Sequence, residues 1–348
     1  MSKLKVLVVI VLAVMLMKCI SLSTGIKGNV APNTKGDESM ANNGVDSGKC
    51  HLFNSKRKFL SFNDDSSNFK FSVEGENAKL DEDELDFINK DNLINIHSQL
   101  TVANQLFQNV LMLDDPISTQ RYDKAKFINI TLESSEKVFG TAYDEVVTNK
   151  ELGLSNCFIG MKMSDKVSAA QNVTPAHELF HLYQNSAMMF KQSWLSEGTA
   201  RWSELLIKEG TGEEEALPAN KDELLEVMDS SYGASKFWTR LFRLIDQNNE
   251  FPVPNYLDTI TYLNDEPILK DNKAYGVTFI KVLFNELSIE SDSVSELKGW
   301  DRYGWKEKDQ KDPKLNPYIW RAVKRAVSKS IPYEKQSEEL RRCMEIEI

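Results

Sequence analysis

Two of the four histidines in this 348-residue chain lie four positions apart, at His177 and His181. They follow Thr174 and Pro175, and a threonine before a proline is typical of a helix start, with Thr174 as the N-cap and Pro175 in the first helical position. Residues four apart share one face of a helix, one turn from each other. Both imidazole rings therefore lie on one face of the expected helix.

This spacing of histidines suits a metal ion. Two imidazoles one turn apart can bind a single Zn²⁺, and Glu178 projects beside the ion. A bound metal lowers the pKa of its water, and Glu178 would take the proton as the general base. A His-Glu-x-x-His pattern arises by chance in about 0.5% of chains of this composition. The alternative is an extracytoplasmic helical protein without a metal, whose histidines are buried and hydrogen-bonded among apolar neighbours such as Leu179 and Phe180.

A hydrolytic zinc ion needs a third protein ligand and an open position for water. No histidine follows His181 in the sequence, so the third ligand must be another residue type. Glu197 lies downstream, in the segment Ser-Trp-Leu-Ser-Glu-Gly-Thr-Ala-Arg-Trp that ends at Trp202. We expect polar residues to turn the chain and a new helix to begin, so that the Glu197 carboxylate reaches back to the metal. The alternative is an ordinary surface glutamate at a helix start.

The pattern His177-Glu178-x-x-His181, followed by Trp-Leu-Ser-Glu197-Gly-Thr-Ala, resembles the gluzincin superfamily of zinc metallopeptidases. In that superfamily two histidines and a downstream glutamate bind the metal. The resemblance implies one Zn²⁺ per chain, bound by His177, His181 and Glu197, with Glu178 as the catalytic base. It also implies a zincin-like α+β fold with a small N-terminal sheet subdomain and a mostly helical C-terminal subdomain.

The chain departs from one well-known member of that superfamily, thermolysin. There an aspartate four residues after the glutamate ligand orients a zinc histidine, whereas this chain has Arg201 at that place. A ligating histidine usually donates its second ring N–H to an acceptor. Glu204, on a similar face of the helix that would carry Glu197, is the candidate acceptor. The alternative is that Glu204 is a solvated glutamate beside Arg201.

Peptide hydrolysis also needs a hydrogen-bond donor for the developing oxyanion. Because no histidine is left for this role, a tyrosine is the natural donor. In aminopeptidase-type gluzincins, a tyrosine at the start of a later helix, often shortly before a glycine, has this role. Tyr232 and Tyr275 both precede a glycine. We favour Tyr232, since its helix follows the Glu197 helix more directly. The alternative for each is a core or capping aromatic side chain.

Residues 1–23 predict a secretory signal peptide. Lys3 and Lys5 precede an apolar run over residues 6–17, and Ser21 and Ser23 offer a small-x-small cleavage site. The run is shorter than the roughly 18 to 20 residues that cross a bilayer. We therefore expect a secreted or extracytoplasmic protein with no stable membrane span after cleavage, and an uncleaved anchor is the weaker alternative.

Cleavage of a signal peptide would remove Cys19 and leave three cysteines, which is an odd number. This count implies no disulfide framework. The sequence allows one cross-link between Cys50 and Cys343, with Cys157 buried in a strand.

Residues 24–75 predict a flexible linker or a pro-segment. The part before Cys50 has almost no large apolar side chain and cannot bury enough surface to order itself. Residues 51–75 alternate aromatic and polar positions in short pieces, which also fits a small hairpin.

The remaining residues, 76–348, predict one zincin-like catalytic domain. Helical spacing of apolar residues predicts a helix over residues 91–113, and strand-like runs follow at 126–132 and 156–163. From residue 174 onward the pattern is mostly helical, so we expect a helix-and-sheet subdomain at 76–173 and a helical subdomain at 174–348. The strand at 156–163 is either an edge strand to which an extended peptide could add, or an ordinary core strand.

The balance of charged residues bears on whether the protein binds nucleic acid. The chain has 52 Asp+Glu and 42 Lys+Arg, a formal net charge of −10, and no basic stripe, so nucleic-acid binding is not expected.

The expected function is zinc-dependent hydrolysis of a peptide or protein substrate. The Gly-Ala-Met-Glu-Asn type of signature that grips a free amine in one aminopeptidase family is absent, which favours an endopeptidase. The alternative is a non-catalytic extracytoplasmic binding protein that keeps a zincin scaffold.

Overall fold

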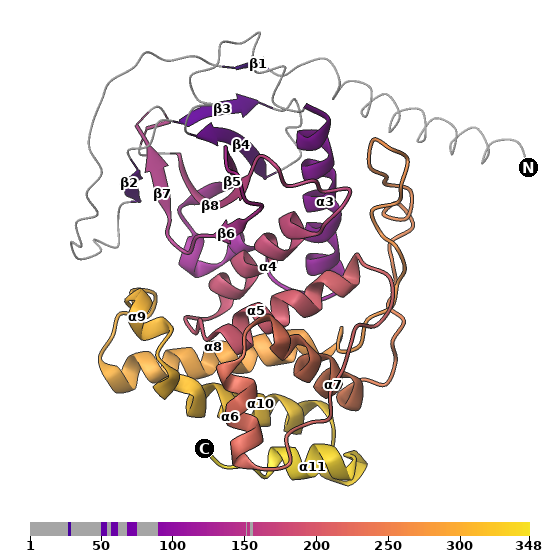
Figure 1. Cartoon of the computed structure of the whole chain (residues 1–348). Helices are drawn as coiled ribbons and strands as arrows, with labels where there is room; N and C mark the ends of the chain where they lie inside the picture. The colour runs from indigo at the N-terminus through magenta and orange to yellow at the C-terminus, as the bar shows by residue number, and fades with distance from the viewer. Residues whose placement is uncertain are drawn as a thin grey trace, which may run out of the picture. The chain divides into compact units, whose positions relative to one another are not determined.

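The computed structural model describes residues 27–28, 50–53, 57–61, 68–74, 90–150, 152–153 and 156–348 (Figure 1). The predicted signal peptide lies outside these residues, and so does most of the segment at 24–49. The described residues form a mixed α and β protein with a helical C-terminal part, which confirms the coarse prediction of the fold class.

Contacts divide the chain into two compact units. Unit 1 comprises Met1–Lys90, Lys124–Phe139 and Glu145–Lys166, and unit 2 comprises Asp91–Asp123, Gly140–Asp144 and Val167–Ile348. The expected boundary at residue 173 therefore lies inside unit 2, because the helix predicted at 91–113 groups with the C-terminal helices rather than with the sheet.

Unit 1 is built around a β-sheet with the strand order β1-β3-β4-β5-β8-β7-β2. Its strands are β1 (Lys27–Gly28), β2 (His51–Phe53), β3 (Arg57–Ser61), β4 (Phe69–Glu74), β5 (Ala125–Glu133), β7 (Val147–Asn149) and β8 (Cys157–Ser164). The three central strands β4, β5 and β8 run parallel. Parallel strands are usually covered on both faces, and β5 is accordingly buried along nearly its whole length.

A small polar cluster fixes the register of β4 against β5. Asn129 donates through Nδ2 to Ser72 Oγ and to Thr131 Oγ1, both at 2.9 Å. The two hydroxyl oxygens lie 3.1 Å apart, and Ser72 is the register partner of Thr131. A shift by one residue would turn these buried polar groups toward apolar neighbours and break their hydrogen bonds, so the cluster disfavours other registers.

The described residues of 51–75 form strands of the sheet, and their role as a pro-segment stays a prediction. Strands β3 and β4 pair antiparallel, as the hairpin alternative predicts, and β4 also pairs with β5. The alternation of aromatic and polar positions is a strand pattern, because Phe71 and Val73 are buried whereas Lys70 is exposed. These residues belong to the sheet, and the expected boundary at residue 76 falls inside unit 1.

The Cys50–Cys343 cross-link that the sequence allows is not formed. A disulfide joins Cys50 to Cys157, with their Cα atoms 6.0 Å apart, and Cys343 is a free, buried cysteine. The reason is topological: β2 follows Cys50 and pairs with β7, which is the sheet neighbour of β8, where Cys157 is the first residue. A disulfide is compatible with an extracytoplasmic location. Among the described residues, no helix combines the length and apolarity that a bilayer crossing requires.

Strand β8 is an interior strand, flanked by β5 on one side and β7 on the other. The main-chain groups of an interior strand are already paired, so β8 does not offer an edge to an extended peptide. Of the two alternatives for residues 156–163, the core strand is confirmed.

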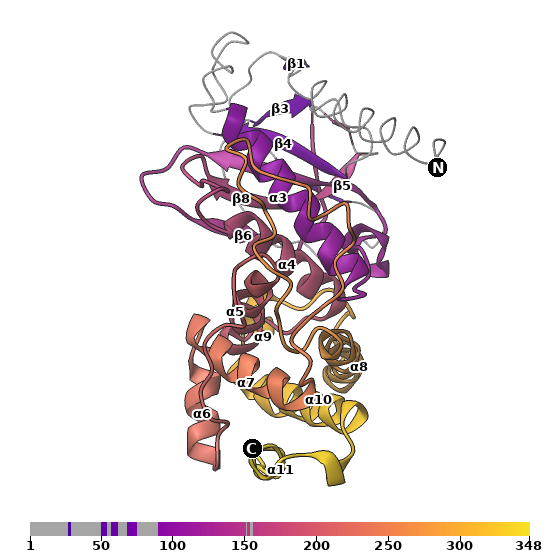
Figure 2. The same cartoon turned by 90° about the vertical axis from the view of Figure 1, so that its right-hand side faces the viewer.

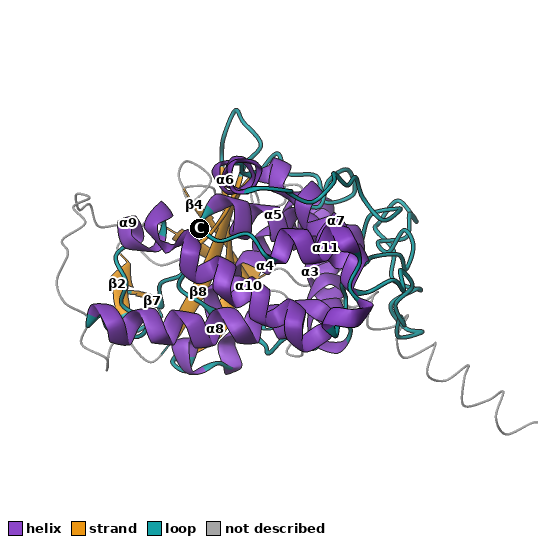
Figure 3. Ribbon diagram, turned by 90° about the horizontal axis from the view of Figure 1, so that it is seen from below, coloured by secondary structure: helices purple, strands orange, loops and turns teal. Residues whose placement is uncertain are grey.

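Unit 2 is mostly helical, and from Val167 to the C-terminus its described elements are helices joined by loops (Figure 3). Its helices are α3 (Lys90–Asn109, all but its first residue), α4 (Thr174–Ala187), α5 (Ser193–Ser203), α6 (Lys221–Asp229), α7 (Ser235–Ile245), α8 (Phe279–Lys298), α9 (Glu307–Gln310), α10 (Asn316–Ser330) and α11 (Glu338–Met344). The short strand β6 (Gly140–Ala142) also belongs to this unit. Helix α3 confirms the helix predicted at 91–113.

The histidine-bearing helix α4 packs on α5 and α8, and α5 packs on α7 (Figure 2). The rings of Trp194 and Trp238 stack in parallel at 5.3 Å, and Trp238 Nε1 donates to Trp194 O at 2.7 Å. A Cβ on Gly198 would lie 2.7 Å from the Trp238 ring, so only glycine lets α5 approach α7 this closely. With Gly198 against α7, the preceding side chain, Glu197, is free to face α4.

Helix α4 begins at Thr174, one residue earlier than an N-cap role for Thr174 requires. The N-cap position is Val173, whose side chain has no acceptor, and Asn172 Oδ1 instead accepts from the Thr174 N–H at 3.2 Å. Gln99 of α3 supplies a further acceptor, because its Oε1 accepts from the Ala176 N–H at 3.3 Å. The free N–H groups at this helix start are thus met from outside the helix.

The side-chain amide of Gln99 is buried, and both its nitrogen and its oxygen have hydrogen-bond partners. Its Nε2 lies within hydrogen-bond distance of Ala169 O at 2.8 Å, Asn172 O at 3.0 Å and Tyr262 Oη at 2.7 Å. One side chain therefore connects α3, the entry to α4 and the loop that precedes α8.

We expect Gln99→Leu to lower the free energy of unfolding by about 1–3 kcal/mol, because buried carbonyls and the Ala176 N–H would lose their partner. Chemical denaturation would measure the change. Gln105→Leu on the same helix is the matched control, since its contacts with Asn109 and Tyr256 are exposed, and its effect should stay within about 0.5 kcal/mol. Equal effects of the two substitutions would contradict this role of Gln99.

Candidate metal centre

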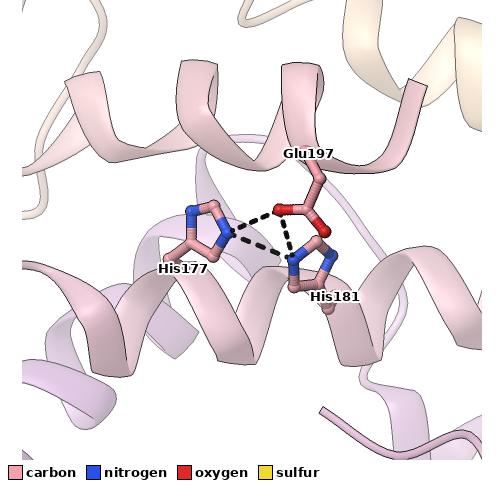
Figure 4. A group of neighbouring side chains, drawn as sticks. All are labelled: His177, His181 and Glu197. Atoms are coloured by element: carbon pink, nitrogen blue, oxygen red, sulfur yellow. Dashed lines mark hydrogen bonds and ion pairs between the residues drawn. The ribbon is translucent and has the colours of Figure 1, made fainter. Parts of the chain in front are cut away.

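His177 and His181 lie one turn apart on α4, and their rings face each other with centroids 4.8 Å apart. Their Nε2 atoms are separated by 3.1 Å. Glu197 comes from the neighbouring helix α5, and its Oε2 lies 3.3 Å from His177 Nε2 and 3.4 Å from His181 Nε2 (Figure 4). The structure thus brings together the three residues expected as ligands, with one ligand atom from each within 4.8 Å of the others, a group that could hold a metal ion.

The second ring nitrogen of His177 faces Glu204. Nδ1 lies 3.0 Å from Glu204 Oε1, and the Glu204 side chain is buried. Arg201 and Lys208 also contact the Glu204 carboxylate. Burial alone would raise the pKa of Glu204, but the contacts with His177 and Lys208 outweigh burial and lower it. Glu204 is therefore a charged acceptor for His177, as the candidate role predicts, and it pairs with Arg201 at the same time.

The second ring nitrogen of His181 faces Gln184, a residue that the sequence analysis missed. Nδ1 lies 2.6 Å from Gln184 Oε1. The amide orientation is fixed from the other side, since Gln184 Nε2 donates to Ser196 O at 2.8 Å and to Thr199 Oγ1 at 2.6 Å. Gln184 therefore orients the His181 ring and ties α5 to α4. Its position three residues after His181, on the same helix face, was a usable signal.

These partners determine where the imidazole protons lie. A carboxylate and an amide oxygen can only accept, so each Nδ1 must carry a hydrogen. In the neutral imidazoles, both Nε2 atoms then present lone pairs to each other and to the Glu197 carboxylate. Three electron-rich atoms at 3.1–3.4 Å repel one another unless a proton or a cation lies among them.

The charges around the rings favour a cation. Burial lowers the pKa of His177, but its hydrogen bonds with Glu197 and Glu204 raise it to about 9. Burial raises the pKa of Glu197, but the two histidines hold it well below its ordinary value. The cluster thus takes up a proton when no metal is present. A divalent cation bound there would be stabilised by the same negative charges.

Glu178 lies beside this cluster and is only 6% exposed. Strand β6 passes directly over its carboxylate, because a Cβ on Gly140 would lie 2.4 Å from Glu178 Oε1. The main chain of Ala142 lies close enough to this carboxylate to lower its pKa. Burial raises the pKa of Glu178, and the two histidines partly oppose the shift. Nothing local to residues 140–142 in the sequence indicates a contact with α4, so the sequence alone does not predict that Gly140 and Ala142 lie beside Glu178.

Of the two tyrosines considered, Tyr232 lies at the cluster. Its ring centroid is 5.8 Å from that of His177, and its hydroxyl lies close enough to the Glu197 carboxylate for that group to affect its pKa. Burial, followed by the charge of Glu197, raises the pKa of Tyr232 to about 12, so the hydroxyl keeps its proton. Tyr275 has other contacts: the Arg243 guanidinium lies 5.5 Å from its ring centroid, and its carbonyl accepts from Trp202 Nε1.

Compared with models of known protein families, with curated proteins and with solved structures, the chain gives no match.

We expect the purified chain to bind one divalent metal ion, and Glu204→Gln to weaken that binding about 10- to 100-fold, because the neutral amide is a poorer acceptor for His177. Competition with a chromogenic chelator would measure the affinity. Glu209→Gln is the control, since Glu209 is exposed on the same segment and should leave the affinity unchanged. Unchanged affinity in Glu204→Gln would rule out this supporting role.

Proposed function

We propose that this chain is a secreted zinc metallopeptidase of the gluzincin type on a zincin-like fold. The observation that carries the proposal is the spacing of the three ligand atoms, 3.1, 3.3 and 3.4 Å. Atoms bound to one zinc ion at 2.0–2.1 Å in a tetrahedral arrangement stand about 3.3 Å apart. The set His177, His181 and Glu197 therefore has the size and the donor chemistry of a zinc site.

The cluster is also accessible to solvent. The side chain of Glu197 is 25% exposed and that of His181 is 14% exposed, whereas the ring of His177 is nearly covered. Tyr232, beside His177, is 56% exposed. Three protein ligands with one open side are typical of catalytic zinc sites, whereas structural zinc sites have four protein ligands.

A bound zinc ion would supply a water of lowered pKa and a positive charge beside the peptide carbonyl. The residues of the chain would carry out the proton transfers. Glu178 would accept the proton of the attacking water and pass it to the leaving amine. Its carboxylate is held next to the ligands by the main chain of Ala142 and by the close passage of Gly140.

Tyr232 is the candidate donor for the oxyanion that forms on the peptide carbonyl. Its hydroxyl keeps its proton and lies at the Glu197 carboxylate, so a small rotation would direct it to a substrate oxygen next to the ligands. Its position in the 3-10 helix Tyr232–Ala234, directly before α7, agrees with the expected helix start.

Two further features support the proposal. The chain combines a sheet that has parallel central strands with a helical C-terminal part, which is compatible with a zincin-like fold. The Cys50–Cys157 disulfide is compatible with export. The missing amine-binding signature favours an endopeptidase that acts on peptide or protein substrates.

We expect the zinc-loaded protein to cleave unstructured casein and a chelator to stop the cleavage. Glu178→Gln should lower kcat by about 10²- to 10⁴-fold with zinc content unchanged, because the amide cannot accept the proton. Glu226→Gln on the exposed face of α6 should behave as wild type. Stoichiometric zinc without any chelator-sensitive cleavage would favour the alternative, a non-catalytic binding protein on the same scaffold.

Tyr232→Phe should lower kcat by about 10²- to 10³-fold with zinc content unchanged, since only the hydroxyl is lost. Tyr275→Phe should leave kcat near the wild-type value, because the contacts of Tyr275 are made by its ring and carbonyl. Steady-state kinetics on a fluorogenic peptide would compare the two variants. Similar losses in both would argue against a direct role for the Tyr232 hydroxyl.

A further inference from the structure

The strand β6 needs a support of its own. It has three residues, Gly140–Ala142, and two of them touch the carboxylate of Glu178. A strand this short gains little from its own main-chain hydrogen bonds. Groups next to it in the sequence can therefore add to the contacts that hold it against α4.

Asp144, two residues after β6, carries such a group. Its Oδ2 lies 2.8 Å from Arg121 Nη2, 2.9 Å from Lys191 Nζ and 3.2 Å from Gln310 Nε2. Burial alone would raise the pKa of Asp144, but Arg121 and Lys191 hold it at about 2. The carboxylate is therefore charged at physiological pH and is bound from several sides.

Arg121 connects this carboxylate to α4. While Nη2 holds Asp144, Nη1 donates to Asn185 O and to Met188 O, the latter at 3.2 Å. These carbonyls belong to the end of α4, where a helix leaves acceptors unpaired and favours a cation. The Arg121 side chain is only 5% exposed. A planar guanidinium can make both sets of bonds at once, which an ammonium group cannot do.

The contacts form a closed ring. Glu178 in the middle of α4 touches β6, β6 leads to Asp144, Asp144 binds Arg121, and Arg121 binds the carboxyl end of α4. The strand is thus attached to the helix at two places. A displacement of β6 away from Glu178 would have to break the buried ion pair or the helix cap.

We propose that Asp144 and Arg121 are positioning residues that hold β6 against Glu178 and so set the orientation of its carboxylate. The structural part of this inference concerns the chain alone. Its catalytic consequence rests on the proposed function, in which Glu178 is the general base. Neither Asp144 nor Arg121 is one of the three ligand residues, so zinc affinity should not depend on them.

The first test uses hydrogen–deuterium exchange on the metal-free protein. In Asp144→Asn, the amides of residues 141–144 should exchange at least tenfold faster than in wild type, while the amides of α10 keep their rates. Asp292→Asn is the control, because it breaks an exposed ion pair with Arg302 that is not part of the ring and should leave residues 141–144 unchanged. Unchanged exchange in Asp144→Asn would overturn the proposal.

The second test compares kinetic parameters of the zinc-loaded protein. Asp144→Asn should lower kcat about tenfold or more, with KM and zinc affinity unchanged. The variant that combines Asp144→Asn with Arg121→Gln should lose no more than the larger single effect, because the two residues act as one unit. A parallel fall in kcat, zinc affinity and thermal stability would indicate general destabilisation and would overturn the positioning role.

A milder variant covers the case in which Asp144→Asn does not fold. Arg121→Lys keeps the charge beside Asp144 but cannot reach both helix carbonyls, so exchange at residues 141–144 should rise by a smaller factor. Wild-type exchange in Arg121→Lys would then overturn the proposal. If no variant, wild type included, cleaves casein, the proposed function fails, and the exchange data still decide the support of β6.

Discussion

The candidate site depends on one electrostatic constraint, the convergence of two imidazole nitrogens on the Glu197 carboxylate. Glu204 and Gln184 hold the Nδ1 hydrogens, so both Nε2 atoms face each other with lone pairs at 3.1 Å. Such a contact is unfavourable without a shared positive charge. The surrounding packing keeps it in place: Gln184 ties α5 to α4, and Gly198 lets α5 approach the Trp238 ring. The folded chain therefore holds these three groups in an arrangement that a bound proton or metal ion would stabilise.

The sequence predicts the parts of this site that local spacing determines. His177 and His181 are one turn apart on any helix, and Glu204 lies on the face of the segment that also carries Glu197. Gly140 and Gln99 could not be found in this way. Each contacts α4 from a segment distant in the sequence, and no periodicity encodes such a contact.

In the N-terminal region as well, contacts between segments distant in the sequence could not be predicted. The alternating residues of β3 and β4 predict a hairpin, but the pairing of β4 with β5 joins Phe69 to Ile128 and has no local signal. The disulfide follows from that topology, since the partner of Cys50 is decided by which strand lies beside β7.

Both ends of α4 are held by polar side chains from residues 91–123. Gln99 meets an N–H at its start, and Arg121 meets carbonyls at its end. Isolated helices of this length are marginal in water, so the histidine-bearing helix owes its rigidity to these caps and to packing on α3, where Phe107 meets Phe180. A helix fixed at both ends keeps its two histidines and Glu178 in one geometry. His177, His181 and Glu178 therefore keep their positions relative to one another.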